Sequence, residues 1–310
     1  MEELDVSVII LTYNEEIHIR RCIENVHSFV KDVFVIDSYS TDKTLQIANE
    51  FEKVTVLQNK WENNYAKQFN WGLEHAPVQS KWVLRLDADE YLLPELINEL
   101  SDKLPFLSEN VSGVVFKRRH YFLGKWMKRG IYPVYLLRMF RYDKAVCEQR
   151  LMDEHIQLLE GTTVDFEGDF VDHNLNNLSW FCNKHVGYAV REAADLLDIE
   201  LDLYGVSQSD DRKNLTAQAM DKRRIKHRYV RMPLFWRVFI YFCYRYFLKG
   251  GFLDGKEGFL WHFLQGWWYR TLVDAKVFEI KRACGMDREK IRKYLSDVYD
   301  CRQVESSNNK

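Results

Sequence analysis

The stretch Val6-Ser7-Val8-Ile9-Ile10-Leu11, followed directly by Thr12-Tyr13-Asn14-Glu15, decides the fold. Its apolar, largely β-branched run predicts a buried strand that ends in polar residues. From Glu15 to Phe29 the apolar side chains then recur at helical spacing, which predicts a helix. A buried strand followed at once by a helix is the beginning of a βαβ unit.

The same alternation continues through the first hundred residues. Further strands are predicted over 33–36, 54–57 and 82–86, and further helices over 41–51, over 65–75 and from Pro94 onward, with Ser40 or Thr41 as the cap of the second helix. Such an α/β pattern predicts a mostly parallel sheet that helices cover on both faces. Ligands of open α/β sheets bind beyond the carboxyl ends of the strands, so the site is expected there.

The later residues predict a change of architecture. Strands are expected over 114–117, 135–140 and 162–166, and a helix over 180–198. The polar, turn-rich residues 205–214 are the best candidate for a boundary. We therefore predict a catalytic domain over 1–205 and a helical, basic and aromatic region over 206–310.

Composition excludes several classes of protein. The chain has 310 residues, of which 46% are hydrophobic and 15% aromatic, with a net charge of −2. These values exclude a mainly disordered chain, a coiled-coil array and a disulfide scaffold. The six cysteines form no CxxC pair, which favours reduced thiols. No signal peptide is expected at the N-terminus, and no run of 18 apolar residues predicts a spanning helix.

Carboxylates end the predicted strands. The first strand ends in Thr12 to Glu16, the second in Asp37 to Asp42, and the fourth in Asp87-Ala88-Asp89-Glu90. Residues i and i+2 leaving a strand point the same way, so Asp87 and Asp89 should converge. Hard oxygen ligands of this kind suit Mg²⁺ or Mn²⁺, which leave coordination positions open for substrate phosphates.

Four blocks of sequence together resemble the family-2 glycosyltransferases of the GT-A fold. They are Ser7 to Glu15, Val35 to Asp42, Ala66 to Leu73 and Leu86 to Glu90, in the order of that family. Three later stretches resemble, more weakly, the branch of this family that builds lipopolysaccharide core and other envelope glycans. They are Asp153-Glu154-His155, Asp172-His173 and Gly250 to Gly255. The resemblance implies a GT-A type sheet and transfer of a sugar from a nucleotide-diphosphate donor.

The resemblance also implies roles for individual residues. Thr12, Tyr13, Asn14, Glu15 and Asp37 would hold the nucleotide, with Lys67 and Asn70 at the edge of its pocket. Asp87 would lie near the ribose or base, and Asp89 would bind the metal on the diphosphate, with Asp87 and His173 as further candidate ligands. For Asn70 and Thr41, ordinary helix capping is the alternative.

Sugar transfer also needs a base for the acceptor hydroxyl. Asp153 and Glu154 are paired acids beside His155 in a loop-like region, and the resemblance favours the second acid, Glu154, with Asp153 as the other choice. The family more often has the order Glu-Asp, and a solvated turn is the alternative. Further phosphate or acceptor contacts are predicted for Arg118, Arg119 and His155, together with Lys184 and Tyr188.

The last third of the chain is basic and aromatic. Residues 222–231 are rich in Lys and Arg, and on a helical wheel of 232–248 Arg237, Arg245 and Lys249 fall opposite Phe235, Phe239 and Phe242. This pattern predicts a helix lying in a membrane interface beside anionic lipid, and the tryptophans of 259–269 favour the headgroup region. A helix packed on the catalytic domain or in a dimer is the alternative, and nucleic-acid binding is not expected.

The sequence thus predicts a metal-dependent, inverting glycosyltransferase at the cytoplasmic face of the inner or plasma membrane, either peripheral or monotopic. It would move a sugar, from a UDP-sugar as the preferred donor, to a lipid-linked oligosaccharide or lipopolysaccharide core, with Mn²⁺ or Mg²⁺ as cofactor. Two other classes stay open: a nucleotidyltransferase or nucleotide-sugar hydrolase on a similar sheet, and a non-catalytic membrane-docking protein.

Overall fold

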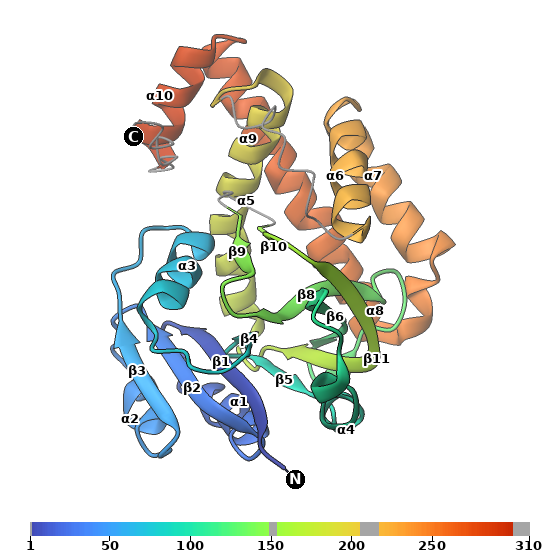
Figure 1. Ribbon diagram of the computed structural model, residues 1–310. Coiled ribbons are helices and arrows are strands. Elements are labelled where there is room, and N and C mark those ends of the chain that lie inside the picture. Colours follow the sequence, from blue (N-terminus) through green and yellow to red (C-terminus); the bar gives the residue numbers. More distant parts are fainter. Residues whose placement is uncertain (1, 149–153, 205–216, 300–310) are drawn as a thin grey trace. The chain divides into compact units, whose positions relative to one another are not determined.

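The computed structural model describes residues 2–148, 154–204 and 217–299 (Figure 1). The chain divides into two compact units. The first holds residues 1–150 and 154–175, and the second holds most of the chain from residue 176 onward. The division falls after Leu175 and not near residue 205, where we predicted it, and residues 205–214 lie outside the described part.

The first unit alternates strands and helices as predicted. Its elements are β1 (Leu4–Thr12), α1 (Ile19–Val26), β2 (Val30–Asp37), α2 (Thr44–Ala48), β3 (Val54–Gln58), α3 (Tyr65–His75), β4 (Trp82–Asp87), β5 (Glu90–Leu92), α4 (Pro94–Lys103), the 3₁₀ turn η1 (Leu104–Phe106), β6 (Val111–Phe122), β7 (Lys125–Trp126), β8 (Val134–Arg141), β9 (Ala145–Cys147), β10 (Ile156–Leu158) and β11 (Thr162–His173).

Nine of the described strands form one mixed sheet, with β9 and β10 as a separate antiparallel pair. The order along the sheet is β3-β2-β1-β4-β8-β6-β11-β5, and β7 pairs with β6. Strands β1 to β4 are parallel, and β8 runs against both of its neighbours. The register pairs Thr12 with Asp37 and Leu11 with Asp87, so the carboxylates of two strand ends reach one edge.

The sheet buries both of its faces, which confirms the predicted α/β architecture. Val8 and Ile10 of β1 pack with α1, α2 and α4, whereas Ile9 packs on the opposite face with α3. Successive strand residues point to opposite faces, and both sets must therefore be apolar. This explains why the strands are solid apolar runs rather than alternating ones.

The first two predicted helices begin later than expected, whereas α3 and α4 begin at Tyr65 and Pro94 as predicted. Residues 15–18 form a turn before α1, and α2 covers only Thr44 to Ala48. The predicted caps Ser40 and Thr41 are wrong: Asp42 accepts hydrogen bonds from the backbone and hydroxyl of Thr44, while the Ser40 hydroxyl donates to Asp37. Side-chain bonds of this kind compete with helix formation.

The strands of the middle region are confirmed but extend further than their apolar cores. Strand β6 runs on through Lys117 to His120 and β11 through Glu167 to His173, because the two pair in parallel there. The short strands β5, β7, β9 and β10 were not predicted. Each has at most three residues, too few for a periodic signal.

The second unit is helical. Its described elements are α5 (Leu178–Leu201), α6 (Ala217–Val230), α7 (Trp236–Cys243), the π turn η4 (Tyr244–Leu248), the 3₁₀ turn η5 (Gly251–Asp254), α8 (Gly255–Trp261), the π turn η6 (His262–Trp268), α9 (Tyr269–Cys284) and α10 (Arg288–Tyr299). Ala193 and Leu197 of α5 share a core with Val273 and Val277 of α9 and Ile291 of α10. Helix α5 therefore belongs to this unit.

The predicted basic outer face over 232–248 is wrong. Arg237 and Arg245 are buried, at 2% and 3% exposed. Arg237 forms an ion pair of 2.5 Å with Asp274 of α9, which is itself fully buried. In contrast, the apolar side chains of Trp236 and Leu248 are 66% and 79% exposed. The helical wheel does not show this burial, because the partner Asp274 is distant in sequence. Lys249 is exposed, as predicted, and Phe242 of the aromatic face is buried.

None of the described helices is long and apolar enough to cross a membrane. The five described cysteines are free thiols, as predicted, and Cys301 lies outside the described residues.

Candidate active site

Two loops at the carboxyl edge of the sheet are joined by side-chain hydrogen bonds. Residues 13–16 follow β1 and residues 38–43 follow β2. The backbone N–H of Asn14 donates to the Ser40 hydroxyl at 2.8 Å, and the Asn14 carboxamide oxygen accepts from the backbone of Thr41 at 2.8 Å. Asn14 adopts a left-handed conformation, with φ 54°, which Asn tolerates. The predicted residues Thr12 and Asn14 are thus brought to one site, beside the exposed Tyr13.

Asp37 is the centre of this loop pair. Its carboxylate is buried and accepts four hydrogen bonds: from the Thr12 hydroxyl, the Gln58 amide, and the backbone and hydroxyl of Ser40. A carboxylate has about four acceptor positions, so the chain's own donors fill them. A nucleotide base can accordingly reach Asp37 only by replacing a donor, of which Gln58, at 3.3 Å, is the most distant.

Glu15 faces His18. The Glu15 carboxylate is 2.6 Å from Nδ1 of His18, and Nε2 of His18 accepts from the backbone of Leu175 at 2.8 Å. Because Nε2 accepts, Nδ1 carries the ring proton and donates it to Glu15. Glu15 therefore ties the end of β1 to the end of β11.

Asp87 and Asp89 take the alternating positions that the sequence predicted. Both are partly exposed, whereas Ala88 and Glu90 are buried. Asp87 lies 3.8 Å from Arg85 and 3.5 Å from Arg138. The Asp89 carboxylate accepts from the Asn174 amide at 2.9 Å.

Arg85 was not predicted, yet it links the two acid groups of the site. Its Nη2 is 3.8 Å from Asp87 and 4.0 Å from Oε1 of Glu154, which is 15% exposed. Burial lowers the pKa of Arg85, but Asp87, Cys147 and Glu154 raise it by more, so its charge is retained. The sequence held a signal for it: an arginine inside a buried strand, two residues before Asp87, faces the same way.

Glu90 and Arg138 form a second buried pair next to Asp87. Arg138 donates to Glu90 at 2.5 Å, and Glu90 also accepts from the backbone N–H of Asp87 at 2.9 Å. Burial raises the pKa of Glu90, while the adjacent Arg138 lowers it. The pair fixes the turn that carries Asp87 and Asp89. Sequence reasoning missed Arg138, because it lies 48 residues from its partner.

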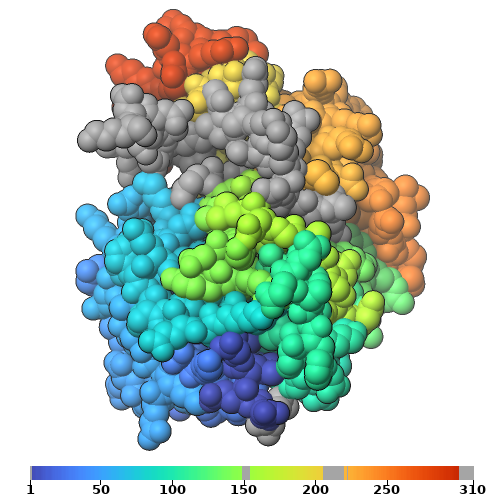
Figure 2. Space-filling model, viewed as in Figure 1, coloured from blue at the N-terminus to red at the C-terminus, as the bar shows by residue number. Residues whose placement is uncertain are grey.

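Asn70 does not point to a nucleotide. Its amide donates to the carbonyl of Cys147 and accepts from the N–H of Cys147, each at 2.8 Å, so α3 holds β9 (Figure 2, where the cyan α3 lies beside the green β9 region). Lys67 of the same helix pairs with Glu62 at 2.7 Å. Asn64, and not Asn70, caps this helix.

The predicted catalytic pair is only partly described. Asp153 lies outside the described residues. Glu154 faces Arg85, and the next residue, His155, donates its backbone N–H to Glu148 at 3.0 Å. Glu148 also accepts from the side chain of Gln157 at 3.2 Å, so it fixes the segment directly after Glu154.

His173 ends β11 beside Asp89. Its backbone N–H donates to the carbonyl of Asp89 at 3.0 Å, and its Nδ1 is 3.3 Å from Nη1 of Arg21. Burial lowers the pKa of His173, and Arg21 lowers it further, which favours the neutral ring. An arginine can only donate, so Nδ1 accepts and the ring proton is on Nε2. In this tautomer the imidazole presents a donor.

The cations of β6 face the acids of β11. Arg118 is 3.4 Å from Asp172, and Nδ1 of His120 is 3.1 Å from the same carboxylate. Arg119 forms an ion pair with Asp169. Both predicted arginines therefore already have carboxylate partners, which weakens their attraction for an anionic acceptor.

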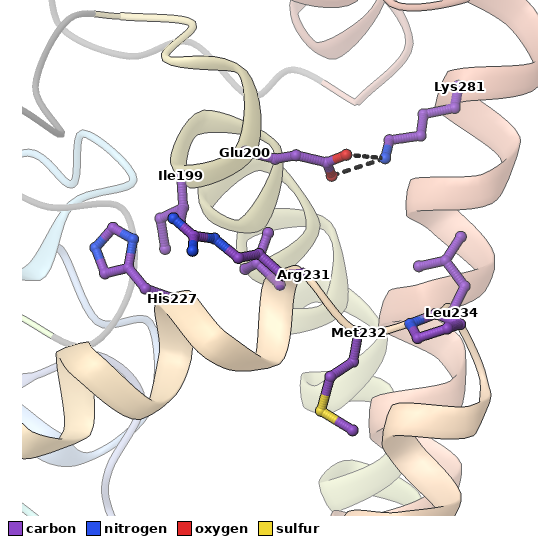
Figure 3. Close-up of a pocket in the computed structure, with 9 residues that line it drawn as sticks. Ile199, Glu200, His227, Arg231, Met232, Leu234 and Lys281 are labelled. Atoms are coloured by element: carbon purple, nitrogen blue, oxygen red, sulfur yellow. Dashed lines mark hydrogen bonds and ion pairs between the residues drawn. The ribbon is translucent and has the colours of Figure 1, made fainter.

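Lys184 and Tyr188 lie in the second unit. Both are on α5, where the Lys184 ammonium is 4.4 Å from the Trp180 ring and 5.6 Å from the Tyr188 ring. The same unit has a pocket of about 510 Å³ (Figure 3). Glu200 and Lys281 pair across one wall at 2.6 Å. None of the residues predicted for the site lines this pocket.

A divalent cation fits the chemistry of Asp87 and Asp89. Within residues 2–148, 154–204 and 217–299, no three His, Cys, Asp or Glu side chains converge as a ready-made cage. Mg²⁺ and Mn²⁺ commonly use one or two carboxylates and take further ligands from substrate phosphates and water. A pair of partly exposed carboxylates at a strand end meets that requirement.

The comparison with known families agrees with this geometry. The family described as "Glycosyl transferase family 2" matches residues 7–156, which run from within β1 through β9 and include Glu154. The chain therefore carries a glycosyl transferase family 2 domain.

Several named glycosyltransferases are similar in sequence. The SPbeta prophage-derived glycosyltransferase SunS of Bacillus subtilis is 36% identical over 81 residues, 26% of this chain and 19% of that protein. The uncharacterized glycosyltransferase RT0209 of Rickettsia typhi is 25% identical over 80% of this chain and 81% of its own length. The lipopolysaccharide core biosynthesis glycosyltransferase LpsC of Rhizobium meliloti is 29% identical over 39% of this chain and 45% of its own. The chain thus spans about a fifth of SunS.

Among solved structures, the mannosyltransferase PcManGT from Pyrobaculum calidifontis, solved with GDP-Man and Mn²⁺, gives a TM-score of 0.49 at 13% identity. The match covers 90% of this chain and 88% of that one.

Proposed function

We propose that this protein is a metal-dependent, inverting glycosyltransferase that moves a sugar from a nucleotide-diphosphate donor, with a UDP-sugar preferred, to a membrane-borne glycan. One observation carries the proposal: Arg85 lies within 4.0 Å of both Asp87 and Glu154, and the register sets Asp87 beside Leu11, at the strand end that leads into the Asn14 loop. The guanidinium of Arg85 thus contacts both Asp87, which is proposed to face the sugar donor, and Glu154, which is proposed to face the acceptor.

The donor would lie over the loop pair after β1 and β2. Asp89, with Asp87 beside it, would hold Mn²⁺ or Mg²⁺ against the diphosphate. The cation, when bound, neutralises the charge that develops on the leaving diphosphate. Asn174 orients the Asp89 carboxylate. His173, with its proton on Nε2, suits donation to a phosphate oxygen better than metal ligation.

Glu154 would act as the general base. An inverting transfer needs one carboxylate on the face of the sugar opposite the diphosphate, as in inverting glycoside hydrolysis. That carboxylate takes the acceptor proton as the hydroxyl attacks the anomeric carbon, while the bond to the diphosphate breaks. Arg85 would keep Glu154 ionised before attack, since a nearby cation favours the charged form.

The acceptor is proposed to be lipid-linked or lipopolysaccharide core, at the cytoplasmic face of the membrane. The similarity to LpsC supports this substrate class. The exposed apolar side chains of Trp236, Phe239, Phe247 and Leu248 support peripheral contact with lipid. Lys226 lends less support than the sequence suggested, because it pairs with Glu192 and Asp195.

Calorimetry with UDP, GDP and dTDP, each with and without Mn²⁺, tests the proposal on wild type and Glu154→Gln. Wild type should bind one nucleotide only with metal, and Glu154→Gln should bind it equally well but lose transfer. Metal-independent binding, or unchanged transfer in Glu154→Gln, would contradict these roles. Release of sugar without any acceptor at the full rate would favour the hydrolase alternative, and lipid binding without nucleotide binding would favour a docking protein.

A further inference from the structure

Arg245 is a buried cation in the second unit with two neutral partners. It is 3% exposed and lies in the π turn η4, which continues α7. Its Nη1 donates to the Tyr241 hydroxyl at 3.1 Å and to the side-chain oxygen of Gln265 at 2.5 Å. Both hydrogen bonds come from Nη1, one of the three nitrogens of the guanidinium.

The other edge of the Arg245 guanidinium is unmatched. Nε and Nη2 are buried and have no hydrogen-bond acceptor among the residues that the structure describes. These two N–H groups are the parallel fork that binds a carboxylate or phosphate at two points. Arg237, eight residues earlier, shows how the same unit fills such a fork internally: its Nε and Nη2 both donate to Asp274.

Two π turns meet at Arg245. Arg245 is in one π turn, and its partner Gln265 is in another, η6. Single π turns are rare and occur frequently at functional sites. Gly266 of η6 has no side chain to place against the guanidinium, and an added Cβ would lie 3.9 Å from Nη1.

Aromatic rings lie close to this buried charge: the Cβ position of Gly266 is also 4.0 Å from the ring of Phe242, which stacks on Tyr246 with ring centroids 5.3 Å apart. The ring of Tyr246, the next residue, contacts those of Phe247, Phe252 and Phe259. These three phenylalanines are all exposed. An anion-binding fork close to exposed aromatic rings fits an amphipathic anion better than a simple ion.

We propose that the Nε/Nη2 fork of Arg245 binds the phosphate of a lipid-like molecule, whose apolar chain lies on the aromatic rings around Tyr246. The phosphate belongs either to an isoprenoid phosphate or to a phospholipid headgroup. The proposed binding of a lipid phosphate is argued from Arg245 alone. The biological role of that binding, as recognition of the acceptor or of the membrane, rests on the proposed function.

Binding is tested by calorimetry with the full chain, without nucleotide or metal. The probes are farnesyl phosphate, dihexanoyl phosphatidic acid, farnesol and inorganic phosphate. Wild type should bind at least one of the two amphipathic phosphates and neither farnesol nor inorganic phosphate comparably. Arg245→Met and Arg245→Lys should weaken that binding at least about tenfold, because a charged hydrogen bond is lost. Arg282→Met, which removes an exposed arginine of α9, is the control and should bind as wild type does.

Thermal unfolding separates a ligand site from a structural one. If Arg245 serves a ligand, Arg245→Met removes an uncompensated buried charge and should leave Tm unchanged or raised. A lowered Tm with unchanged binding would overturn the proposal, as would equal binding of farnesol or no binding of either amphipathic phosphate. Preference for farnesyl phosphate assigns an isoprenoid, and preference for phosphatidic acid assigns a headgroup. Because nucleotide is absent, failure of the proposed donor site leaves this result standing.

Discussion

The side-chain amide of Asn70 forms two hydrogen bonds to the backbone of Cys147, one as donor and one as acceptor, each 2.8 Å long. It thereby imitates a neighbouring strand along one residue of β9. Beyond Cys147 come Glu148, which binds the backbone of His155, and Glu154 itself. Asn70 thus positions the segment of the proposed base, although it touches no reacting group.

We expect Asn70→Ala and Asn70→Asp to lower kcat about 100-fold, the cost of misplacing a catalytic group by about 1 Å. The affinity for donor nucleotide should stay unchanged, since both amide contacts are to Cys147. Steady-state kinetics with calorimetry of nucleotide binding would check this. A raised KM at unchanged kcat would mean instead that Asn70 contacts the donor, as the family resemblance implied.

Asp89→Ala should abolish Mn²⁺-dependent nucleotide binding. Asn174→Ala should weaken Mn²⁺ activation about 10- to 100-fold, as is usual when the partner of a metal-binding carboxylate is removed. Titration of Mn²⁺ against activity and binding measures both effects. Asp102→Ala, which removes an exposed carboxylate of α4, is the control. Equal Mn²⁺ dependence in Asp89→Ala and Asp102→Ala would rule out Asp89 as the ligand.

The buried pair of Arg237 and Asp274 should be costly to break singly. Asp274→Leu alone leaves the guanidinium uncompensated and should lower the free energy of unfolding by about 3–5 kcal/mol. The double variant Arg237→Met with Asp274→Leu should recover most of that loss, since an apolar pair of similar volume needs no desolvated charge. Denaturant unfolding of wild type, the two single variants and the double variant measures this, and a loss in the double variant equal to the sum of the two single losses would contradict it.

Stability should fall at alkaline pH through Cys147. Burial raises the pKa of its thiol from 9.0 to about 12, because the thiolate is disfavoured there, although Arg85 opposes the shift. Below pH 9 the thiol is protonated in both the folded and the unfolded chain, so it costs no stability. As the pH rises from 9 towards 12, the thiol ionises only in the unfolded chain, and the free energy of unfolding therefore falls. The free energy of unfolding should fall by up to about 1.4 kcal/mol per pH unit from this group.

Cys147→Ala should flatten that dependence between pH 9 and 10.5. Cys182→Ala, at a partly exposed thiol, should leave the slope as in wild type. Identical slopes for wild type and Cys147→Ala would show that the thiol does not ionise on unfolding.

Exposed apolar side chains, rather than the buried Arg237 and Arg245, support the proposed contact with the membrane. Changing Trp236, Phe247 and Leu248 together to Ser should weaken binding to phosphatidylglycerol vesicles at least about tenfold, because each loses more than a kcal/mol of apolar burial. Phe106→Ser, at a position 85% exposed in the first unit, is the control. Co-sedimentation that is unchanged by the triple variant but abolished by salt would favour an electrostatic contact instead.

The sequence by itself predicted the long strands of the sheet and the acidic residues that follow them. The apolar runs of β1, β2 and β4 and the polar residues directly after them are local signals, and parallel pairing brings those strand ends to one edge whatever the rest of the chain does. The alternation predicted for Asp87 to Glu90 appears in their burial, with Asp87 and Asp89 partly exposed and Ala88 and Glu90 buried; their role as metal ligands stays a prediction.

Tertiary structure alone decided which charges face which. Arg85 and Arg138 join Asp87, Glu90 and Glu154 across as many as 69 residues, and no periodicity reports such pairing. The family resemblance implies that Asn70 lies at the nucleotide pocket, but in the structure its amide binds the backbone of Cys147. In the second unit the helical wheel separates basic from aromatic side chains, but it cannot show that the distant carboxylate of Asp274 pairs with Arg237. That ion pair holds Arg237 inside the unit, while the neighbouring ring of Trp236 stays exposed.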